Sequence, residues 1–360
     1  MPLDELSLYE SPAIPPKHDY GIGIIGAGAI VRFAHLPAYR KAGFNVIGIY
    51  DKSPEAAESA AVEFDIPTVY NGIDALLDDP RVEIVDIAVP APFQPEIAHA
   101  VIATGRPMLC QKPLAESFDE AKAIVTAAEA AGLKIAVNQQ MRWEPAIATT
   151  RAFIERGLLG EPLVSTIDVS IMLGWEAWPW LVVSEHLDLM YHSIHYQDAT
   201  RFLFGMPDRV FTSGGKFPDQ PERAETRTHT IFEYDSGLTA MVRSNNWNWT
   251  GDQHAICRFE GSEGRIEGTL GLLYNYPHGR PDTIRYMSKK LRPDHWFDVV
   301  VEDLWIPDAF IGPMASLMEA IQTDGVPVTA ARDNLDTLRT LFAAYRSMET
   351  HRVVAPIDID

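Results

Sequence analysis

Up to about residue 140, short apolar runs alternate with longer segments whose apolar residues recur at helical spacing. Apolar runs bounded by Gly, Pro or Asn predict buried strands, and the longer segments predict helices. Strands that alternate with helices are typical of a doubly wound parallel sheet, so we predict an α/β domain here. The predicted strands cover 22–25, 44–50, 68–70, 82–89, 108–110 and 134–137, and the predicted helices cover 53–64, 72–77, 95–104 and 118–131.

Beyond Pro145 the pattern changes to longer stretches in which apolar and polar residues alternate. This pattern predicts an α+β domain with a large, mostly antiparallel, open-faced sheet, and the segments 235–237 and 261–264 fit hairpin turns. Because a broad sheet needs cover, we expect its open face to join the subunits of a homodimer or homotetramer. The predicted elements are a helix over 146–156, strands over 163–172, 228–234, 239–245 and 254–260, and a last helix over 333–349.

The length of the chain, 360 residues, is enough for two hydrophobic cores. We therefore divide it into an N-terminal arm (1–19), a first domain (20–143) and a second domain (144–360) whose last helix can pack back on the first domain. The arm carries acids and prolines but no basic segment followed by an apolar one, so we do not expect a secretory signal. We expect it to pack on its own or a neighbouring subunit.

Composition and charge exclude several classes of partner. The chain is 46% hydrophobic and 22% charged, as is usual for soluble globular proteins, and its net charge is −20. Nucleic acids and anionic membranes select basic surfaces, so we expect neither as a partner. No apolar run approaches the roughly 20 residues that cross a bilayer. The two cysteines, Cys110 and Cys257, do not form a disulfide framework, and we expect a cytoplasmic protein.

The segment from residue 20 to 51 carries the first sign of chemistry. An apolar strand runs into a turn with Gly26 and Gly28, a helix follows, and a second strand ends at Asp51. Glycines there permit a tight turn and close approach of a pyrophosphate to the helix N-terminus, and the carboxylate can accept the ribose hydroxyls. This is a Rossmann βαβ unit that favours NAD over NADP, although Lys52 weakens that preference. The third glycine position holds Val31, and an ordinary strand–turn–helix is the alternative.

Two further motifs, Gln111-Lys112-Pro113 and the histidine segment from His192 to Asp198, complete a familiar set. With them the chain from about residue 20 onward resembles the glucose–fructose oxidoreductase/inositol dehydrogenase/rhizopine-catabolism (Gfo/Idh/MocA) family. The resemblance implies oxidation or reduction of a secondary alcohol of a sugar or cyclitol with a nicotinamide cofactor.

The resemblance also implies a cofactor site. Gln111 stands where the family has the glutamate of Glu-Lys-Pro, and Gln94 replaces a common histidine. The residues expected at the cofactor are Gly26, Gly28, Ala29, Ile30, Asp51, Lys52, Val89, Pro90, Gln94, Gln111, Lys112 and Gln140.

The catalytic set that we predict is Lys112, His195 and Tyr191. Oxidation of an alcohol requires a base near neutral pKa, and His195 matches the histidine of the family. The family often has an aspartate four residues earlier, where this chain has Tyr191, which could orient the imidazole. Lys112, at the end of a strand, could donate to the reacting oxygen. The alternatives are a core histidine and a solvated loop lysine.

Aromatic and polar residues of the second half could bind the substrate, because indole faces suit the C–H faces of sugars. Packing of the core or of an interface is the alternative for the tryptophans. A zinc site with His186, His192 and His195 lacks a further ligand at a familiar spacing, and we predict no metal. The residues expected at the substrate are Lys112, Arg142, Trp143, Trp175, Trp178, His192, His195 and Asp198.

The sequence thus predicts an NAD-dependent oxidoreductase of sugars, glycosides or cyclitols, with His195 as acid/base and Lys112 orienting the reacting oxygen. Two alternatives stay open. One is an enzyme that keeps NAD bound and oxidises the sugar transiently before an elimination or epimerisation. The other is a non-catalytic nucleotide-sensing subunit.

Overall fold

The computed structural model describes residues 8–274, 276 and 278–360. The chain folds into two compact units. The Rossmann unit consists of Pro12–Gln140 and Ile306–Leu335, and the sheet unit consists of the described residues of 8–11, Met141–Trp305 and Asp336–Asp360. The segment Ile306–Leu335 therefore returns to the first unit, whereas our division of the sequence assigned it to the second domain.

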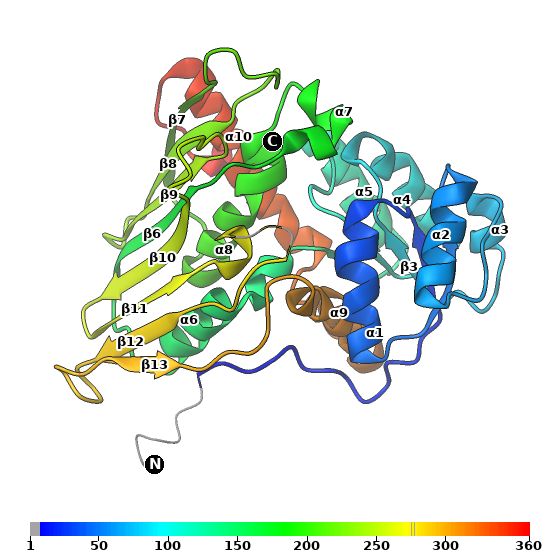
Figure 1. Ribbon diagram of the computed structural model, residues 1–360, viewed down its shortest axis with the longest axis horizontal. Coiled ribbons are helices and arrows are strands. Elements are labelled where there is room, and N and C mark those ends of the chain that lie inside the picture. Colours follow the sequence, from blue (N-terminus) through cyan, green and yellow to red (C-terminus); the bar gives the residue numbers. More distant parts are fainter. Residues whose placement is uncertain (1–7, 275, 277) are drawn as a thin grey trace. The chain divides into compact units, whose positions relative to one another are not determined.

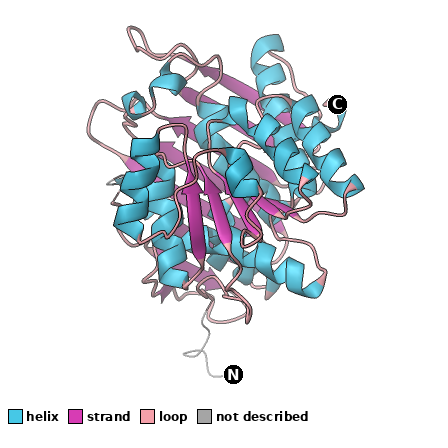
Figure 2. Ribbon diagram, turned by 90° about the vertical axis from the view of Figure 1, so that its right-hand side faces the viewer, coloured by secondary structure: helices cyan, strands magenta, loops and turns pink. Residues whose placement is uncertain are grey.

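The Rossmann unit contains a five-stranded sheet in the order β2-β1-β3-β4-β5, in which all neighbours are parallel. A single parallel bridge from Val69 to Ile49 extends the sheet beyond β2. Counting that bridge as a rudimentary strand gives the order of a dinucleotide-binding fold. Helices cover both faces of this sheet (Figure 2), so the predicted fold class is confirmed. The strands are β1 (Ile22–Ile25), β2 (Val46–Tyr50), β3 (Ile84–Ile87), β4 (Met108–Cys110) and β5 (Ile135–Val137).

The helices of this unit follow local sequence signals. Ser53 accepts a hydrogen bond from the amide of Ala56 at 3.2 Å and caps a helix that Pro54 opens. The predicted strand over 68–70 is reduced to the bridge at Val69. The helix over Ile311–Thr323 was not predicted. The helical elements are η2 (Val31–His35, a π-helix), α1 (Leu36–Ala42), α2 (Pro54–Phe64), α3 (Ile73–Leu77), η3 (Ala91–Phe93), α4 (Gln94–Ala103), α5 (Phe118–Ala130), η8 (Asp308–Phe310) and α9 (Ile311–Thr323).

The sheet unit contains an eight-stranded sheet in the order β13-β12-β11-β10-β6-β9-β8-β7. All neighbours are antiparallel except β6 and β9, so the prediction of a mostly antiparallel sheet is confirmed. The strands are β6 (Pro162–Ser170), β7 (Arg209–Gly215), β8 (Arg227–Glu233), β9 (Thr239–Asn245), β10 (His254–Gly261), β11 (Gly264–Thr269), β12 (Ile284–Ser288) and β13 (Phe297–Val299).

One face of the eight-stranded sheet is covered and the other is open. Along β8, residues alternate strictly between exposed and buried, which orients Phe232 inward and Ile231 outward. Helices α6, α8 and α10 lie along the covered face (Figure 1). The helical elements are η4 (Gln140–Trp143), α6 (Pro145–Glu155), η5 (Trp175–Ala177), α7 (Pro179–Val182), η6 (Asp188–Ser193, a π-helix), α8 (Ile194–Phe204), η7 (Gly271–Tyr274), α10 (Ala331–Thr350, which begins in the Rossmann unit) and η9 (Pro356–Asp358).

Among the described residues, no helix combines the length and the apolar character that a bilayer span requires.

Candidate functional site

The glycine turn after β1 has the geometry that a dinucleotide needs. Gly26 has a φ of +115°, and a Cβ there would lie 2.3 Å from the carbonyl oxygen of Ala88, so only glycine fits. Its amide donates to the carbonyl of Tyr50 at 2.7 Å, which ties the turn to β2. A Cβ on Gly28, in contrast, would meet no protein atom within 4 Å. Packing within the protein thus does not require glycine at position 28, and the exposed backbone there leaves room for a ligand to approach.

Asp51 lies directly after β2 and faces the same turn. Its Oδ2 accepts from the amide of Ala27 at 2.7 Å, and its Oδ1 accepts from the amide of Ser53 at 2.8 Å. The carboxylate is thereby oriented while it remains partly exposed, with lone pairs left for ribose hydroxyls. The ammonium of the neighbouring Lys52 is exposed and lies 5.6 Å from the centre of the Phe93 ring.

The other predicted cofactor residues of this unit border the same end of the sheet. Ala29 is exposed, and Ile30, Val89 and Pro90 are partly exposed. Since ligands of open α/β sheets bind beyond the carboxyl ends of the strands, these residues fit a dinucleotide. Gln140 is buried, and its Oε1 accepts no hydrogen bond from a described residue.

Gln94 holds the lysine loop. Its amide nitrogen donates to the carbonyls of Gln111, Pro113 and Leu114 at 2.8, 3.0 and 2.9 Å, and its Oε1 accepts from the amide of Gln111 at 2.8 Å. We had predicted that Gln94 contacts the cofactor. Gln94 is fully buried and lies behind the loop. The sequence could not reveal this, because the four partner groups belong to the backbone.

Lys112 follows β4 and precedes a cis peptide bond to Pro113. It is only partly exposed, and burial lowers the pKa of its ammonium from 10.5 to about 7. A lysine with this pKa is present in both protonation states at neutral pH, as a group that exchanges protons during catalysis should be.

In the sheet unit, the structure adds a residue that we did not predict. Asp188 is fully buried and accepts hydrogen bonds from Ser193, Thr228, Ser244 and Asn246. Its carboxylate also lies 3.5 Å from Nδ1 of His192. Although burial raises the pKa of Asp188, the hydrogen bonds from His192, Thr228 and Ser244 leave that pKa below its ordinary value.

His192 is fixed at both ring nitrogens, since its Nε2 lies 3.0 Å from the hydroxyl of Tyr196. It is 8% exposed, and the edge of Trp175 packs against it. The signal in the sequence was the spacing of Asp188 and His192, which are four residues apart. We applied that spacing only to His195.

His195 and Tyr191 pack against tryptophans of the same unit. The ring of His195 meets that of Trp305 edge to face with centroids 5.6 Å apart, and Tyr191 meets Trp180 at 5.1 Å. Both side chains are largely buried. We had placed Tyr191 and His195 on one face from regular α-helical spacing. Residues 188–193 form a π-helix, so that spacing does not hold there.

Arg142 and Asp198, both predicted at the substrate, are brought together by the structure. Nε and Nη2 of Arg142 donate to the two carboxylate oxygens of Asp198 at 2.8 and 2.7 Å, and Thr337 donates to the same carboxylate at 2.6 Å. Asp198 is fully buried. This bidentate pair joins η4, α8 and α10.

The predicted tryptophans differ in exposure. Trp175 is buried, whereas Trp178 and Trp143 are partly exposed. Trp178 packs against both Trp175 and Tyr276, with centroids 6.4 and 6.3 Å apart. These rings form an aromatic cluster next to His192.

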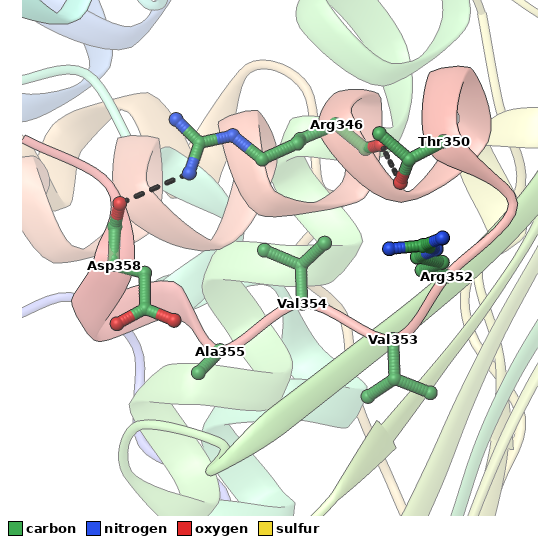
Figure 3. A pocket seen from close by; sticks show the side chains of 7 residues that line it. All are labelled: Arg346, Thr350, Arg352, Val353, Val354, Ala355 and Asp358. Carbon is green, nitrogen blue, oxygen red and sulfur yellow. Dashed lines mark hydrogen bonds between the residues drawn. The ribbon is translucent and has the colours of Figure 1, made fainter.

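No group of three or more His, Cys, Asp or Glu side chains in the described part of the chain could hold a metal ion. One pocket of about 510 Å³ lies between α10 and the segment that follows it (Figure 3). None of the predicted site residues lines it, and the guanidinium of Arg346 there donates to the carbonyl of Asp358 at 3.0 Å.

Comparison with known proteins gives matches along most of the chain. Residues 20–139 match a family described as "Oxidoreductase family, NAD-binding Rossmann fold", and residues 147–267 match the "GFO/IDH/MocA C-terminal domain". A D-apiose dehydrogenase of Paraburkholderia graminis is 27% identical, with 92% of this chain and 88% of the relative aligned. A D-xylose 1-dehydrogenase (NADP(+)) of Haloferax volcanii is 26% identical over 92% of this chain and 98% of its own.

A crystal structure of an oxidoreductase from Agrobacterium radiobacter in complex with NAD+ superposes with a TM-score of 0.82. It is 21% identical and covers 94% of this chain and 98% of its own, a likeness that shows the fold. Together, the two matched domains and the two-unit fold establish that the chain belongs to the Gfo/Idh/MocA family of oxidoreductases.

Proposed function

We propose that the protein oxidises a secondary hydroxyl of a sugar, glycoside or cyclitol and transfers the hydride to a nicotinamide dinucleotide. The observation that carries this proposal is Lys112, a lysine with a pKa of about 7 at the same sheet edge as the glycine turn. Two relatives that align over most of the chain are named as dehydrogenases of D-apiose and D-xylose. These names support a sugar as the class of substrate.

The reaction divides into a hydride and a proton. The bound dinucleotide supplies the hydride acceptor, and the residues of this chain must take the proton from the hydroxyl. Lys112 in its neutral form can accept that proton, and in its charged form it stabilises a developing alkoxide. We assign His195 as the second acid/base group, with Tyr191 orienting it.

We assign His192 to binding of a substrate hydroxyl. Asp188 and Tyr196 hold its two ring nitrogens, so the imidazole has one orientation. Trp175, which packs against it, and Trp178, which packs against Trp175, could cover a sugar ring. Trp143 belongs to the same proposed surface, whereas Arg142 and Asp198 act through the packing of the helices.

For the cofactor we propose NAD over NADP. The carboxylate of Asp51 is fixed at the end of β2, where it suits free ribose hydroxyls and repels a 2′-phosphate. Lys52 acts in the opposite direction, and one relative is named as NADP-dependent. The ratio of kcat/KM for the two cofactors tests this preference, and a ratio above one for NADP would overturn it.

We also propose that the open face of the eight-stranded sheet joins subunits. Residues paired across neighbouring strands form one row on this face. Phe211, Ile231 and Met241 lie at one end of the row, Thr166 connects the two ends, and ion-paired Arg258, Glu267 and Arg285 lie at the other end. Phe211 and Ile231 are each 38% exposed. Light scattering should find a dimer or tetramer that Ile231→Glu dissociates, while Val62→Glu on α2 leaves it intact. A monomeric wild-type protein would overturn this proposal.

The location that we propose is the cytoplasm, because both cysteines are free and buried, as in proteins of reducing compartments.

A panel of aldoses, anhydrosugars, glycosides and cyclitols tests the function. We expect NADH formation with at least one of them, and loss of that activity in Lys112→Met. Turnover of a sugar without net NADH would instead indicate the cycle with bound cofactor. Binding of NADH without turnover of any substrate would indicate the nucleotide-sensing subunit.

A further inference from the structure

A buried polar cluster lies under the lysine loop of the Rossmann unit. His35 at the end of η2, Tyr39 on α1 and Asp86 on β3 are each at most 1% exposed. Nδ1 of His35 lies 2.7 Å from Oδ2 of Asp86, and the hydroxyl of Tyr39 donates to the same oxygen at 2.8 Å. Both contacts fall on the same carboxylate oxygen of Asp86, whereas its Oδ1 has no hydrogen-bond partner among the described residues. Burial of such groups is costly unless hydrogen bonds offset it, so the bonds to Oδ2 fix this arrangement.

The second ring nitrogen of His35 meets two side-chain amides. Nε2 lies 3.0 Å from Nε2 of Gln111 and 3.1 Å from Nδ2 of Asn138. The orientation of the Gln111 amide is fixed independently, because its Oε1 accepts from the backbone amide of Lys112 at 2.9 Å. Gln111 must therefore donate to His35. It follows that Nε2 of His35 accepts, that Nδ1 carries the hydrogen, and that the imidazole is neutral.

These contacts form a continuous chain from Asp86 to the lysine. Asp86 holds His35, His35 holds the Gln111 amide, and Gln111 holds the backbone of Lys112. The π-helix that carries His35 begins at the glycine turn, where the carbonyl of Gly28 accepts from the amides at 31 and 32 at 3.1 and 3.2 Å. The same short element thus connects the dinucleotide turn to the lysine loop.

We propose that His35 is a positioning residue for Lys112, acting as a neutral imidazole that accepts a hydrogen bond from Gln111. The proposal rests on the proposed function, because it gives His35 a task only if Lys112 takes part in proton transfer. The other groups that surround the His35 ring are compatible with a neutral imidazole. Asp86 and Tyr39 face one side, Cys110 lies on the neighbouring strand within electrostatic reach of Asp86, and Phe310 packs on the ring at 5.2 Å.

Two substitutions of His35 test the contacts of its two ring nitrogens separately. The amide of His35→Asn reaches only the position of Nδ1, so it keeps the bond to Asp86 and loses the one to Gln111. The amide of His35→Gln reaches the position of Nε2 and can accept from Gln111. We expect kcat of His35→Asn to fall about 10- to 100-fold, the effect of misplacing a reacting group by about 1 Å. His35→Gln should retain most of kcat, and both should bind NADH as the wild type does.

Tyr39→Phe is the matched control. It removes a buried hydrogen bond to Asp86 and a 3.4 Å contact with Nδ1 of His35, but it leaves the bonds from Nε2 of His35 through Gln111 to Lys112 in place. We expect a lower melting temperature with kcat unchanged. Equal kcat losses in Tyr39→Phe and His35→Asn, or equal losses in His35→Asn and His35→Gln, would show a merely structural role and overturn the proposal.

Gln111→Glu gives a second test that does not require a change in His35. A carboxylate cannot donate to Nε2 of an imidazole whose hydrogen is on Nδ1, so Gln111→Glu removes the hydrogen bond between residue 111 and His35. We expect kcat of Gln111→Glu to fall about as far as that of His35→Asn, because both variants lose the same contact. A Gln111→Glu variant with the wild-type kcat would refute the role of the neutral imidazole.

The titration of Lys112 itself, followed by NMR of the labelled lysine side chain in the free protein, needs no substrate. We expect it to change in His35→Asn and to be kept in Tyr39→Phe. If the wild-type protein oxidises no sugar but this difference is found, the proposed function fails and the contact chain stands. If the wild type is active and the titration is the same in all variants, the positioning role fails.

Discussion

Replacing Glu225 with glutamine should change how the stability of the sheet unit depends on pH. Oε1 of Glu225 accepts from the amides of Leu187 and Leu189 at 3.3 and 3.2 Å and from the hydroxyl of Tyr345 at 2.9 Å. Burial, and to a lesser degree the nearby charge of Asp188, raises the pKa of Glu225 from 4.5 to about 7.

The direction of the effect follows from that rise. Below about pH 4.5 the carboxyl is protonated in both the folded and the unfolded chain. Between about 4.5 and 7 the unfolded chain ionises first, so the folded state loses stability as pH rises, and above about 7 the loss is complete. At roughly 1.4 kcal/mol per pH unit, the whole loss is about 3 kcal/mol. About 2 kcal/mol of it falls between pH 5.5 and 8.

Glu225→Gln keeps an acceptor for the three donors and cannot ionise. Urea unfolding, followed by the fluorescence of the tryptophans in the sheet unit, should therefore show the variant gaining about 2 kcal/mol on the wild type between pH 5.5 and 8. Glu185→Gln is the control, because that carboxylate is exposed and pairs with Arg223 at 2.6 Å on the surface. A stability difference between Glu225→Gln and the wild type that is the same at both pH values would refute the reasoning.

Three further predictions concern the proposed site. Lys112→Met should lower kcat by about 100- to 10,000-fold with little change in NADH affinity. In the wild type, kcat/KM for alcohol oxidation should fall as pH drops below about 7, because Lys112 becomes protonated. A flat profile of kcat/KM against pH in steady-state kinetics would contradict this prediction. Gly26→Ala should destabilise the Rossmann unit, since its Cβ would lie 2.3 Å from a carbonyl oxygen. Gly28→Ala should fold normally and bind NADH more weakly. The same behaviour of the two variants in melting curves and NADH titrations would contradict this prediction. Asp188→Asn should raise KM for the sugar more than it lowers kcat, because His192 loses its charged partner; a change in kcat alone would assign His192 to proton transfer instead.

Most of the first half of the fold was predictable because its strands and helices follow local signals, with the strand predicted over 68–70 as an exception. Ser53 and Pro54 mark a helix start, and the strand that ends before Asp51 is apolar throughout. The second half of the fold was less predictable. Strand β11 has one buried residue among its six, so its alternation is too weak to detect.

Long-range polar contacts explain what the sequence could not show at the site. We predicted Asp198 as a substrate ligand from its position in the sequence. In the structure, Arg142 and Thr337, from distant parts of the chain, donate hydrogen bonds to its carboxylate. Gln94 was expected at the cofactor, and its partners are backbone groups of another loop. His35 lies in the helix after the glycine turn and gave no signal, because its role depends on residues 51 to 103 positions away.

Initial-rate measurement of NADH absorbance, with the sugar panel offered to the wild type and to Lys112→Met, tests the central claim most directly. We predict that the wild type forms NADH in proportion to oxidised sugar and that the variant loses at least about 100-fold of this rate. Equal rates in the two proteins, or no reduction of bound NAD with any sugar, would contradict it.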